Sequence, residues 1–222
     1  MAFSNGPTIV RDGLVLALDA SDRNSYLGSG TTWTDISGNG NNGTLTNGPT
    51  FNSGNGGSIV FDGVDDYAIT GNFPSCANWS TEMFLYPTVF TTSQKVILDV
   101  NVGIRFEINN GKFNSHFGNG SSWIYTFLPS TTTFAANTWY HVVVTVQSGG
   151  QAKIYVNSVL ENTTNIGSGT TPNIPLYIAR YTGATGYEFS GRVGVTRIYN
   201  KSLSQLEILQ NYNATKTRFG LK

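Results

Sequence analysis

The feature that most constrains the fold of this chain is an apolar periodicity of two, repeated in short runs over nearly its whole length. In residues 14–19 the leucines alternate with Val15 and Ala17, which places one apolar row on one face of an extended segment. Similar runs occupy residues 58–62, 66–70, 81–86, 95–100, 103–108, 112–117, 122–128, 139–146, 152–157, 174–179 and 189–199. Gly, Asn and Ser cluster between them, for instance at residues 109–111, where Gly and Asn tolerate the positive φ of tight turns.

Many short strands at this spacing are typical of an antiparallel sandwich or jelly roll. Strands do not alternate with helices, which argues against a parallel-sheet enzyme fold. The chain carries no internal repeat and no linker, although residues 37–57 form a long Gly- and Asn-rich stretch anchored by Leu45 and Phe51. We therefore expect one all-β domain over residues 1–222, long enough to bury a sizeable core.

One helix is expected, at about residues 204–213. Ser204 and Glu207 have the spacing of a capping box, in which each side chain bonds the other residue's backbone amide. Leu203 and Ile208 stand where a hydrophobic staple would lie. The apolar stripe expected to pack on the sandwich is formed by Leu206, Leu209 and Tyr212.

Charge is scarce in this sequence: 12% of the residues are charged, and 13 basic residues balance 13 acidic ones. A chain with this charge balance has no net positive charge that would attract nucleic acid or an anionic membrane. No window approaches the ~18 consecutive apolar residues of a membrane-spanning helix. We expect neither nucleic acid nor a membrane among the partners.

The single cysteine, Cys76, excludes an intrachain disulfide and a disulfide-stapled scaffold. It has no basic neighbour that would lower its pKa, which predicts an unreactive thiol. Residues 1–7 contain neither the basic nor the apolar segment of a secretory signal. The expectation is synthesis in a cytoplasm without export.

Several motifs resemble one family. They lie at residues 13–19 (Gly-Leu-Val-Leu-Ala-Leu-Asp), 32–45, 57–67, 137–145 (Asn-Thr-Trp-Tyr-His-Val-Val-Val-Thr), 153–157 and 189–209. In this order they resemble the laminin-G-like (LamG) jelly-roll branch of the concanavalin A-like lectin/glucanase superfamily. The resemblance implies an all-β, two-sheet antiparallel jelly-roll sandwich with one short C-terminal helix. A signal-less version rich in Asn, Thr and Gly is also similar to virion structural proteins of tailed bacteriophages, marine ones in particular.

Four aromatic residues are the candidates for ligand binding: Trp123, Tyr125, Tyr181 and Tyr187. In residues 122–128 either alternating row could be the exposed one, because the apolar side chains do not share one face. Residues 181–187 carry two tyrosines among small residues, a composition of adaptable recognition surfaces. The alternative for that segment is an ordinary surface loop. Trp33 and Trp139 are predicted to belong to the core.

The densest acidic cluster is residues 62–66, with Asp62, Asp65 and Asp66. Carboxylate oxygens suit calcium, and related laminin-G-like domains sometimes bind it. The favoured interpretation is a hairpin turn in which the Asp side chains bond the local backbone. We therefore expect no cofactor, with calcium as the less favoured alternative.

Catalytic patterns are missing from the sequence. Glycosidases on this superfold resemble one another in placing Glu and Asp at alternate positions of one strand, about 5 Å apart. Here no carboxylate lies two to five positions from Glu82, Glu107, Glu161, Glu188 or Glu207. The only two histidines, His116 and His141, are too few for a histidine-rich metal site, and His141 is expected to pack or hydrogen-bond within its strand. We expect a protein that is not an enzyme.

Two function classes remain. The first is a structural protein of a phage virion, located in the capsid decoration, tail or fibre and bound to copies of itself or to other virion proteins. Nearly charge-free strands favour it, because edge strands usually need charges to prevent pairing. The alternative is a carbohydrate-binding adhesin module that recognises host surface glycans through the four aromatic residues. A degenerate hydrolase is a distant third, since it would need two facing carboxylates.

Overall fold

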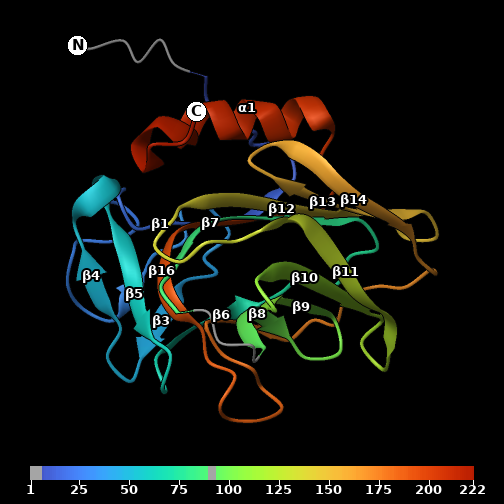
Figure 1. Cartoon of the computed structure of the whole chain (residues 1–222), viewed down its shortest axis with the longest axis horizontal. Coiled ribbons are helices and arrows are strands. Elements are labelled where there is room, and N and C mark those ends of the chain that lie inside the picture. Colours follow the sequence, from blue (N-terminus) through green and yellow to red (C-terminus); the bar gives the residue numbers. More distant parts are fainter. Residues whose placement is uncertain (1–6, 90–93) are drawn as a thin grey trace.

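The computed structural model describes residues 7–89 and 94–222. They form two antiparallel β-sheets that pack face to face, with one helix lying across the outer side of one sheet (Figure 1). Apolar side chains alternate inward along the strands, so each sheet presents an apolar face to the other. The prediction of an all-β, two-sheet sandwich with one short C-terminal helix is confirmed.

Sheet A has the strand order β14-β13-β12-β7-β16-β5-β4, and β1 also pairs with β16. Its strands are β1 (Leu14–Asp19), β4 (Thr50–Asn52), β5 (Ser58–Asp62), β7 (Trp79–Pro87), β12 (Tyr140–Val146), β13 (Gln151–Val156), β14 (Val159–Asn165) and β16 (Ser190–Tyr199). Sheet B has the order β11-β10-β9-β8-β15-β6-β3-β2. Its strands are β2 (Thr32–Trp33), β3 (Gly43–Thr46), β6 (Tyr67–Asn72), β8 (Lys95–Val100), β9 (Ile104–Asn109), β10 (Lys112–Gly118), β11 (Trp123–Thr133) and β15 (Pro175–Ile178). The helical segments are η1 (Gly54–Gly56), α1 (Gln205–Thr215) and η2 (Lys216–Phe219).

Four strands were not predicted from the sequence: β2, β3, β4 and β14. The first three lie in or next to the Gly- and Asn-rich stretch, where Leu45 of β3 is one of few side chains that reach the core. Strand β14 buries none of its side chains and so shows no apolar row. These strands exist because their backbones pair with neighbouring strands, a stabilisation that side-chain periodicity does not report.

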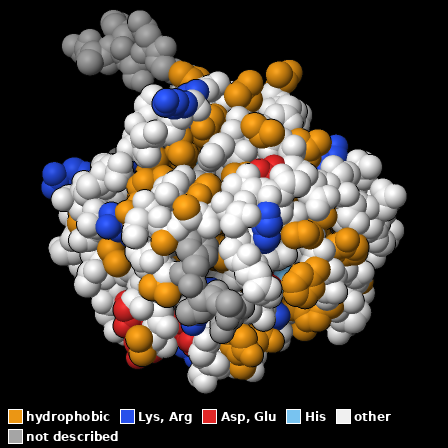
Figure 2. Space-filling view, viewed as in Figure 1, with side chains coloured by type: hydrophobic (Ala, Val, Ile, Leu, Met, Phe, Trp, Pro, Cys, Tyr) orange, Lys and Arg blue, Asp and Glu red, His pale blue; other side chains and the backbone are white. Residues whose placement is uncertain are grey.

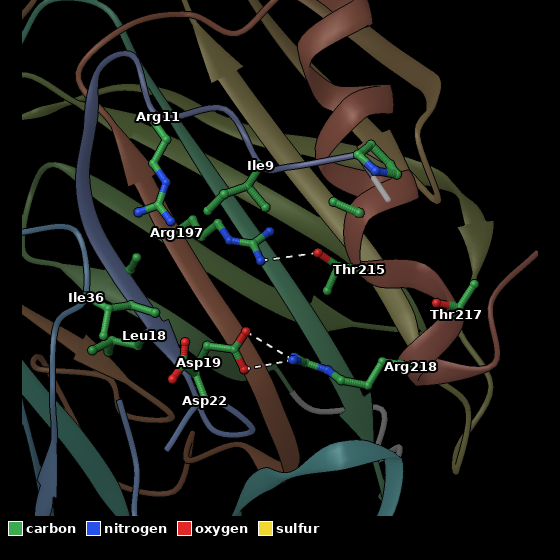
Figure 3. A pocket seen from close by; sticks show the side chains of 13 residues that line it. Ile9, Arg11, Leu18, Asp19, Asp22, Ile36, Arg197, Thr215, Thr217 and Arg218 are labelled. Carbon is green, nitrogen blue, oxygen red and sulfur yellow. Dashed lines mark hydrogen bonds and ion pairs between the residues drawn. The ribbon is translucent and has the colours of Figure 1, made fainter. Parts of the chain in front are cut away.

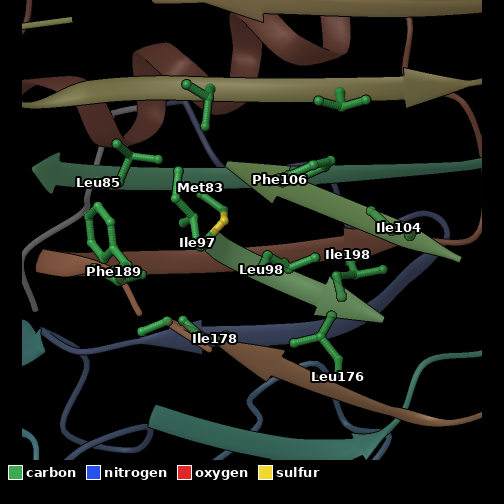
Figure 4. Packing of buried hydrophobic residues seen from close by; sticks show 14 of the residues in the cluster. Met83, Leu85, Ile97, Leu98, Ile104, Phe106, Leu176, Ile178, Phe189 and Ile198 are labelled. Carbon is green, nitrogen blue, oxygen red and sulfur yellow. The ribbon is translucent and has the colours of Figure 1, made fainter. Parts of the chain in front are cut away.

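The core fills the space between the sheets (Figure 4). Met83 and Leu85 of sheet A meet Leu98, Ile104 and Phe106 of sheet B, and all five are fully buried. Both indoles predicted to be buried are buried: Trp33, 0% exposed, lies in this core, whereas Trp139, 6% exposed, lies in a separate cluster with Tyr212 of α1 and Phe219 of η2.

Helix α1 begins as expected. The Glu207 amide donates to Ser204 Oγ at 3.3 Å and the Ser204 amide donates to Glu207 Oε2 at 2.8 Å, which completes the capping box. The staple residues Leu203 and Ile208 are both buried in one apolar cluster on the outer side of sheet A.

The predicted apolar stripe of α1 is wrong in two of its three positions. Leu206 is 77% and Leu209 39% exposed, while Tyr212 is buried. The buried stripe is Ile208, Asn211, Tyr212 and Thr215. Asn211 takes the central place because its Nδ2 donates to Glu82 Oε2 at 2.8 Å, a buried acceptor that no apolar side chain could satisfy.

The sandwich is closed on one side by a contact between two edge strands. Glu161 of β14 accepts hydrogen bonds from the amides of Thr131 and Thr132 in β11, at 2.9 and 3.0 Å. Asn162 Nδ2 donates to the Pro129 carbonyl at 2.8 Å. The edge strands β14 and β11 therefore cover each other's backbone groups in part, which lowers their capacity to pair with another chain.

Candidate functional site

The outer face of sheet B carries polar side chains where the inner face carries the core. In β9, Arg105 and Glu107 alternate with the buried Ile104 and Phe106, so they point away from the core. His116 of β10 pairs with Arg105 across the strands. Despite facing outward, these polar residues are at most 8% exposed, because a loop and neighbouring aromatic side chains cover them.

The covering loop comprises residues 180–188 between β15 and β16 and lies below sheet B in Figure 1. It is closed at its base by the Phe189 amide, which donates to the Ala179 carbonyl at 3.1 Å. It is fixed to β8 by two further bonds, from the Val96 amide to the Tyr187 carbonyl at 2.7 Å and from Lys95 Nζ to the Gly186 carbonyl at 3.0 Å. These bonds hold the backbone of the loop against sheet B.

Arg105 lies against two aromatic rings that come from distant parts of the chain. Its guanidinium carbon lies 3.9 Å from the ring centroid of Tyr181 in the loop and 4.8 Å from that of Trp123 in β11. Tyr187 meets Tyr181 edge-on, with ring centroids 5.6 Å apart. Cations over aromatic faces are attracted by the ring quadrupole, so these residues hold one another in place.

Asp99 joins Arg105 to the loop. Its Oδ1 accepts from Arg105 Nε at 3.1 Å. Its Oδ2 accepts from the Thr182 amide at 3.1 Å and from the Thr182 hydroxyl. The carboxylate is fully buried, and its hydrogen bonds fix both the arginine and the loop.

A hollow of about 150 Å³ opens beside this cluster. It is lined by Tyr67, Tyr177, Arg180 and Thr182, so Thr182 borders both the hollow and the Asp99–Arg105 pair. The rings of Tyr67 and Tyr177 lie 6.0 Å apart, and Arg180 covers Tyr67 with its guanidinium carbon 4.5 Å from the ring centroid. Aromatic walls with a few fixed polar groups are the usual composition of a ligand pocket.

His116 forms the other end of the site. Its Nε2 lies 3.1 Å from Glu107 Oε2, within ion-pair distance, but in an orientation that makes no hydrogen bond. Its ring lies 6.0 Å from Trp123 and 5.1 Å from Phe127. Phe127 has φ of 70° and is 52% exposed, an unusual combination for a large apolar side chain.

Three of the four predicted binding residues, Trp123, Tyr181 and Tyr187, come together at this site, and Tyr125 does not. Trp123 pairs with Gly118 while Tyr125 pairs with Phe117, so a shift of register in β11 turns them to opposite faces. Tyr125 packs against the core.

Sequence reasoning missed Asp99, Arg105 and Thr182. The signal available for Arg105 was its place, with Glu107, at alternate positions of an otherwise apolar strand.

A second hollow, of about 260 Å³, lies between β1, α1 and η2 (Figure 3). Three of its charged groups are engaged within the protein: Arg218 lies 2.9 Å from Asp19, and Arg197 NH2 donates to Thr215 Oγ1 at 3.2 Å. These contacts fasten the C-terminal segment to β1 and β16, which is a structural role.

Residues 62–66 form a turn in which Asp62 and Asp66 bond the local backbone, as predicted, but the prediction of a hairpin was wrong, because β5 lies in sheet A and β6 in sheet B. Asp62 Oδ1 accepts from the Val64 amide at 2.8 Å, a bond that lowers the pKa of Asp62. Asp66 Oδ2 accepts from the Asp62 amide at 3.1 Å, while burial raises the pKa of Asp66. The carboxylate oxygens of Asp62, Asp65 and Asp66 lie within 4.8 Å of one another, and those of Asp62 and Asp66 accept from local backbone amides.

Other surface features match the composition. Lys and Arg side chains are scattered singly over the face in Figure 2, whereas hydrophobic side chains gather over β10 and β11 at its lower right. Within the described residues no helix is long and apolar enough to cross a membrane.

The single cysteine lies in an environment that disfavours the thiolate. Burial raises the pKa of the Cys76 thiol, and the hydrogen bond with Thr171 opposes this effect. The raised pKa supports the prediction of an unreactive cysteine.

The sequence profile of a family described as the concanavalin A-like lectin/glucanases superfamily (Laminin_G_3) matches residues 61–209. The chain belongs to this superfamily. The superfamily takes in both lectins and glucanases, so membership alone does not select binding or catalysis. No curated protein sequence matches the chain significantly.

Solved structures share the lectin-like fold of this superfamily member at low sequence identity. The binding domain of Paraclostridial Mosquitocidal Protein 1 is 17% identical, with a TM-score of 0.74 over 91% of this chain and 52% of that one. The botulinum neurotoxin serotype D ligand-binding domain in complex with N-acetylneuraminic acid is 16% identical, with a TM-score of 0.72 over 91% and 51%. The botulinum neurotoxin DC binding domain in complex with SialylT is 15% identical, with a TM-score of 0.71 over 92% and 52%. This chain spans about half the length of these domains.

Proposed function

We propose that this chain is a glycan-binding module that takes its ligand on the outer face of sheet B. The observation that carries the proposal is the convergence of Tyr181 and Trp123 on Arg105, next to the hollow walled by Tyr67 and Tyr177. Sugars present apolar C–H faces and many hydroxyl groups. Aromatic rings suit the first, and positioned charged and amide groups suit the second.

Preorganisation supports the same function. The loop that carries Tyr181 and Tyr187 is held by hydrogen bonds to Asp99 and to β8, so little conformational entropy is lost when a ligand binds. The hollow is shallow and small, at about 150 Å³, which suits one or two sugar rings with modest affinity per site. Many copies of such a site on one surface would raise the overall affinity by avidity.

The related folds support this proposal in a general way. Several similar structures are receptor- or ligand-binding domains, and two of them are complexes with N-acetylneuraminic acid or SialylT. Those domains are about twice the length of the matched region. Their ligands therefore do not indicate which face of this chain binds a glycan.

A non-catalytic role is part of the proposal. The carboxylates on this face have internal partners: Asp99 binds Arg105 and Thr182, and Glu188 Oε2 accepts from the Gly186 amide at 2.8 Å. A carboxylate held in this way is a poor proton donor or nucleophile. We expect no hydrolysis of any β-glucan, measured as release of reducing ends. Turnover abolished by one Glu→Gln substitution would contradict this.

Glycan binding can be tested on an array with the Trp123→Ala, Tyr181→Ala double variant. The expected result is a defined glycan signal in the wild type that the double variant loses. Tyr86→Ala is the matched control, because Tyr86 also packs under an arginine, Arg192 at 4.5 Å, but on sheet A. A folded wild-type protein that binds no glycan would overturn the proposal.

A second candidate is the role of a structural subunit in a tailed-phage virion, assembled with itself or with other virion proteins. It is favoured by exposed apolar side chains on neighbouring elements, β14 and α1, which Gln205 Nε2 links by donating to the Ser158 carbonyl at 2.7 Å. They are Val159, Leu160, Leu206 and Leu209, between 39% and 77% exposed. Solution mass measured for the wild type and for Leu206→Glu tests this role: an oligomer that dissociates in the variant supports it, and a monomer at all concentrations opposes it.

A further inference from the structure

Arg105 has hydrogen-bonding capacity that the protein does not use. Its Nε donates to Asp99, and neither terminal nitrogen donates to an acceptor within residues 7–89 and 94–222. A guanidinium group has five N–H donors, so four of them have no acceptor among the described residues. The side chain is only 10% exposed. Donors so nearly buried gain much from an acceptor that a ligand supplies.

Acceptors on this face are, by contrast, already occupied. Both oxygens of Asp99 are engaged, and Glu188 accepts from the loop backbone. Glu107 Oε2 accepts a hydrogen bond from Gln94. The site therefore has surplus donors and few free acceptors, which selects for a ligand that brings acceptor oxygens.

The surroundings of Arg105 favour an acceptor that approaches the edge of its guanidinium group. Strand order places Tyr181 and Trp123 on opposite sides of β9, since the loop follows β15 and Trp123 lies in β11. Because the rings of Tyr181 and Trp123 lie against the guanidinium group, ligand atoms reach it at its edge. There, two parallel N–H groups match the two oxygens of a carboxylate.

We propose that the ligand of this site is an acidic glycan whose sugar carboxylate, as in a uronic or sialic acid, pairs bidentately with Arg105. This inference rests on the proposed glycan-binding function and narrows its ligand class. Neutral sugars would leave the four donors of Arg105 without a charged partner, whereas a carboxylate brings two acceptor oxygens that match the two parallel N–H groups.

The test compares carboxylated ligands with neutral and sulfated ones. Immobilised oligogalacturonate and its methyl ester form one pair, and sialyllactose, sulfated lactose and lactose form a second set. We expect the wild type to bind the carboxylated member of each set at least about tenfold more tightly than its neutral or sulfated counterparts. Arg105→Lys keeps the charge but loses the fork, and should lose about the same factor. Arg192→Lys, on sheet A beside Tyr86, should change nothing.

The outcomes separate the two proposals. Equal affinity for acid and ester, or a preference for sulfate, overturns the carboxylate inference and leaves glycan binding standing. If the folded wild-type protein binds no glycan at all, both the glycan-binding proposal and the carboxylate inference are overturned. The wild-type comparison of acid with ester decides the inference even where Arg105→Lys fails to fold.

Discussion

Glu82 Oε1 and His141 Nε2 lie 2.9 Å apart beneath helix α1, and both side chains are fully buried. Arg197 NH1 lies 3.2 Å from the same carboxylate oxygen, and Asn211 Nδ2 donates to the other. One carboxylate thus joins β7, β12 and β16 to the helix. The expectation of a packing or hydrogen-bonding role for His141 is confirmed, although its partner, Glu82 on the neighbouring strand β7, was not foreseen.

The first prediction concerns the loss of this carboxylate charge. Glu82→Gln leaves the Arg197 guanidinium buried without its counter-ion, so we expect the free energy of unfolding to fall by about 3 kcal/mol. Urea unfolding at neutral pH measures the change. Asp12→Asn is the control, because the Lys201–Asp12 pair is solvent-exposed and should contribute little. Equal midpoints for Glu82→Gln and the wild type would contradict the anchoring role.

A second prediction follows from the ionisation of Glu82. Burial alone would raise the pKa of Glu82, but the charge of Arg197 and the hydrogen bond from His141 outweigh it, so the pKa lies below its usual value. A lowered pKa in the folded state contributes stability above the unfolded pKa of about 4.3, and that stability is lost as the pH falls through the folded pKa. Unfolding free energy should therefore decline below about pH 4.3, less steeply in Glu82→Gln. Parallel acid limbs in the two proteins would argue against this assignment.

The third prediction tests the start of α1. Ser204→Ala removes the hydroxyl that accepts from the Glu207 amide, and the usual cost of losing such a cap is about 1 kcal/mol. Thermal or chemical unfolding detects a loss of that size. Ser202→Ala, two residues earlier, should leave stability unchanged because its hydroxyl bonds none of the described residues. If both variants unfold alike, the capping box does not stabilise the helix.

Local patterns in the sequence were sufficient for most of the fold. The period of two identified the strands with one buried face, and the Ser204–Glu207 spacing located the helix. The choice of buried stripe in α1 failed because Asn211 is buried by a distant acceptor, Glu82, and local hydrophobicity carries no information about that pairing. The same limit explains why Glu82 looked isolated: its partners lie on neighbouring strands and on the helix.

The candidate site was predictable only in part. Tyr181 and Tyr187 stand out in a loop of small residues, and Trp123 stands out in a polar segment. Which of Trp123 and Tyr125 faces outward depends on the register shift in β11, which only the pairing with β10 determines. The partnership of Arg105 with both Tyr181 and Trp123 joins three segments through sheet order, so no short sequence window contains it.

The last prediction concerns the bond between the loop and the sheet. Thr182→Val preserves the shape of the side chain but removes the hydroxyl that donates to Asp99 Oδ2, while the amide bond to the same oxygen remains. Because the hydrophobic core is untouched, the melting temperature should stay nearly constant. Amide hydrogen exchange in residues 180–188 should accelerate, since local opening of the loop becomes easier. Thr185→Val is the matched control: Thr185 is exposed at the tip of the same loop and bonds none of the described residues. Binding to any glycan identified on the array should weaken in Thr182→Val alone, because a looser loop must be ordered when the ligand binds. Unchanged exchange in the loop would mean that the backbone bonds to β8, rather than Asp99, hold Tyr181 against Arg105.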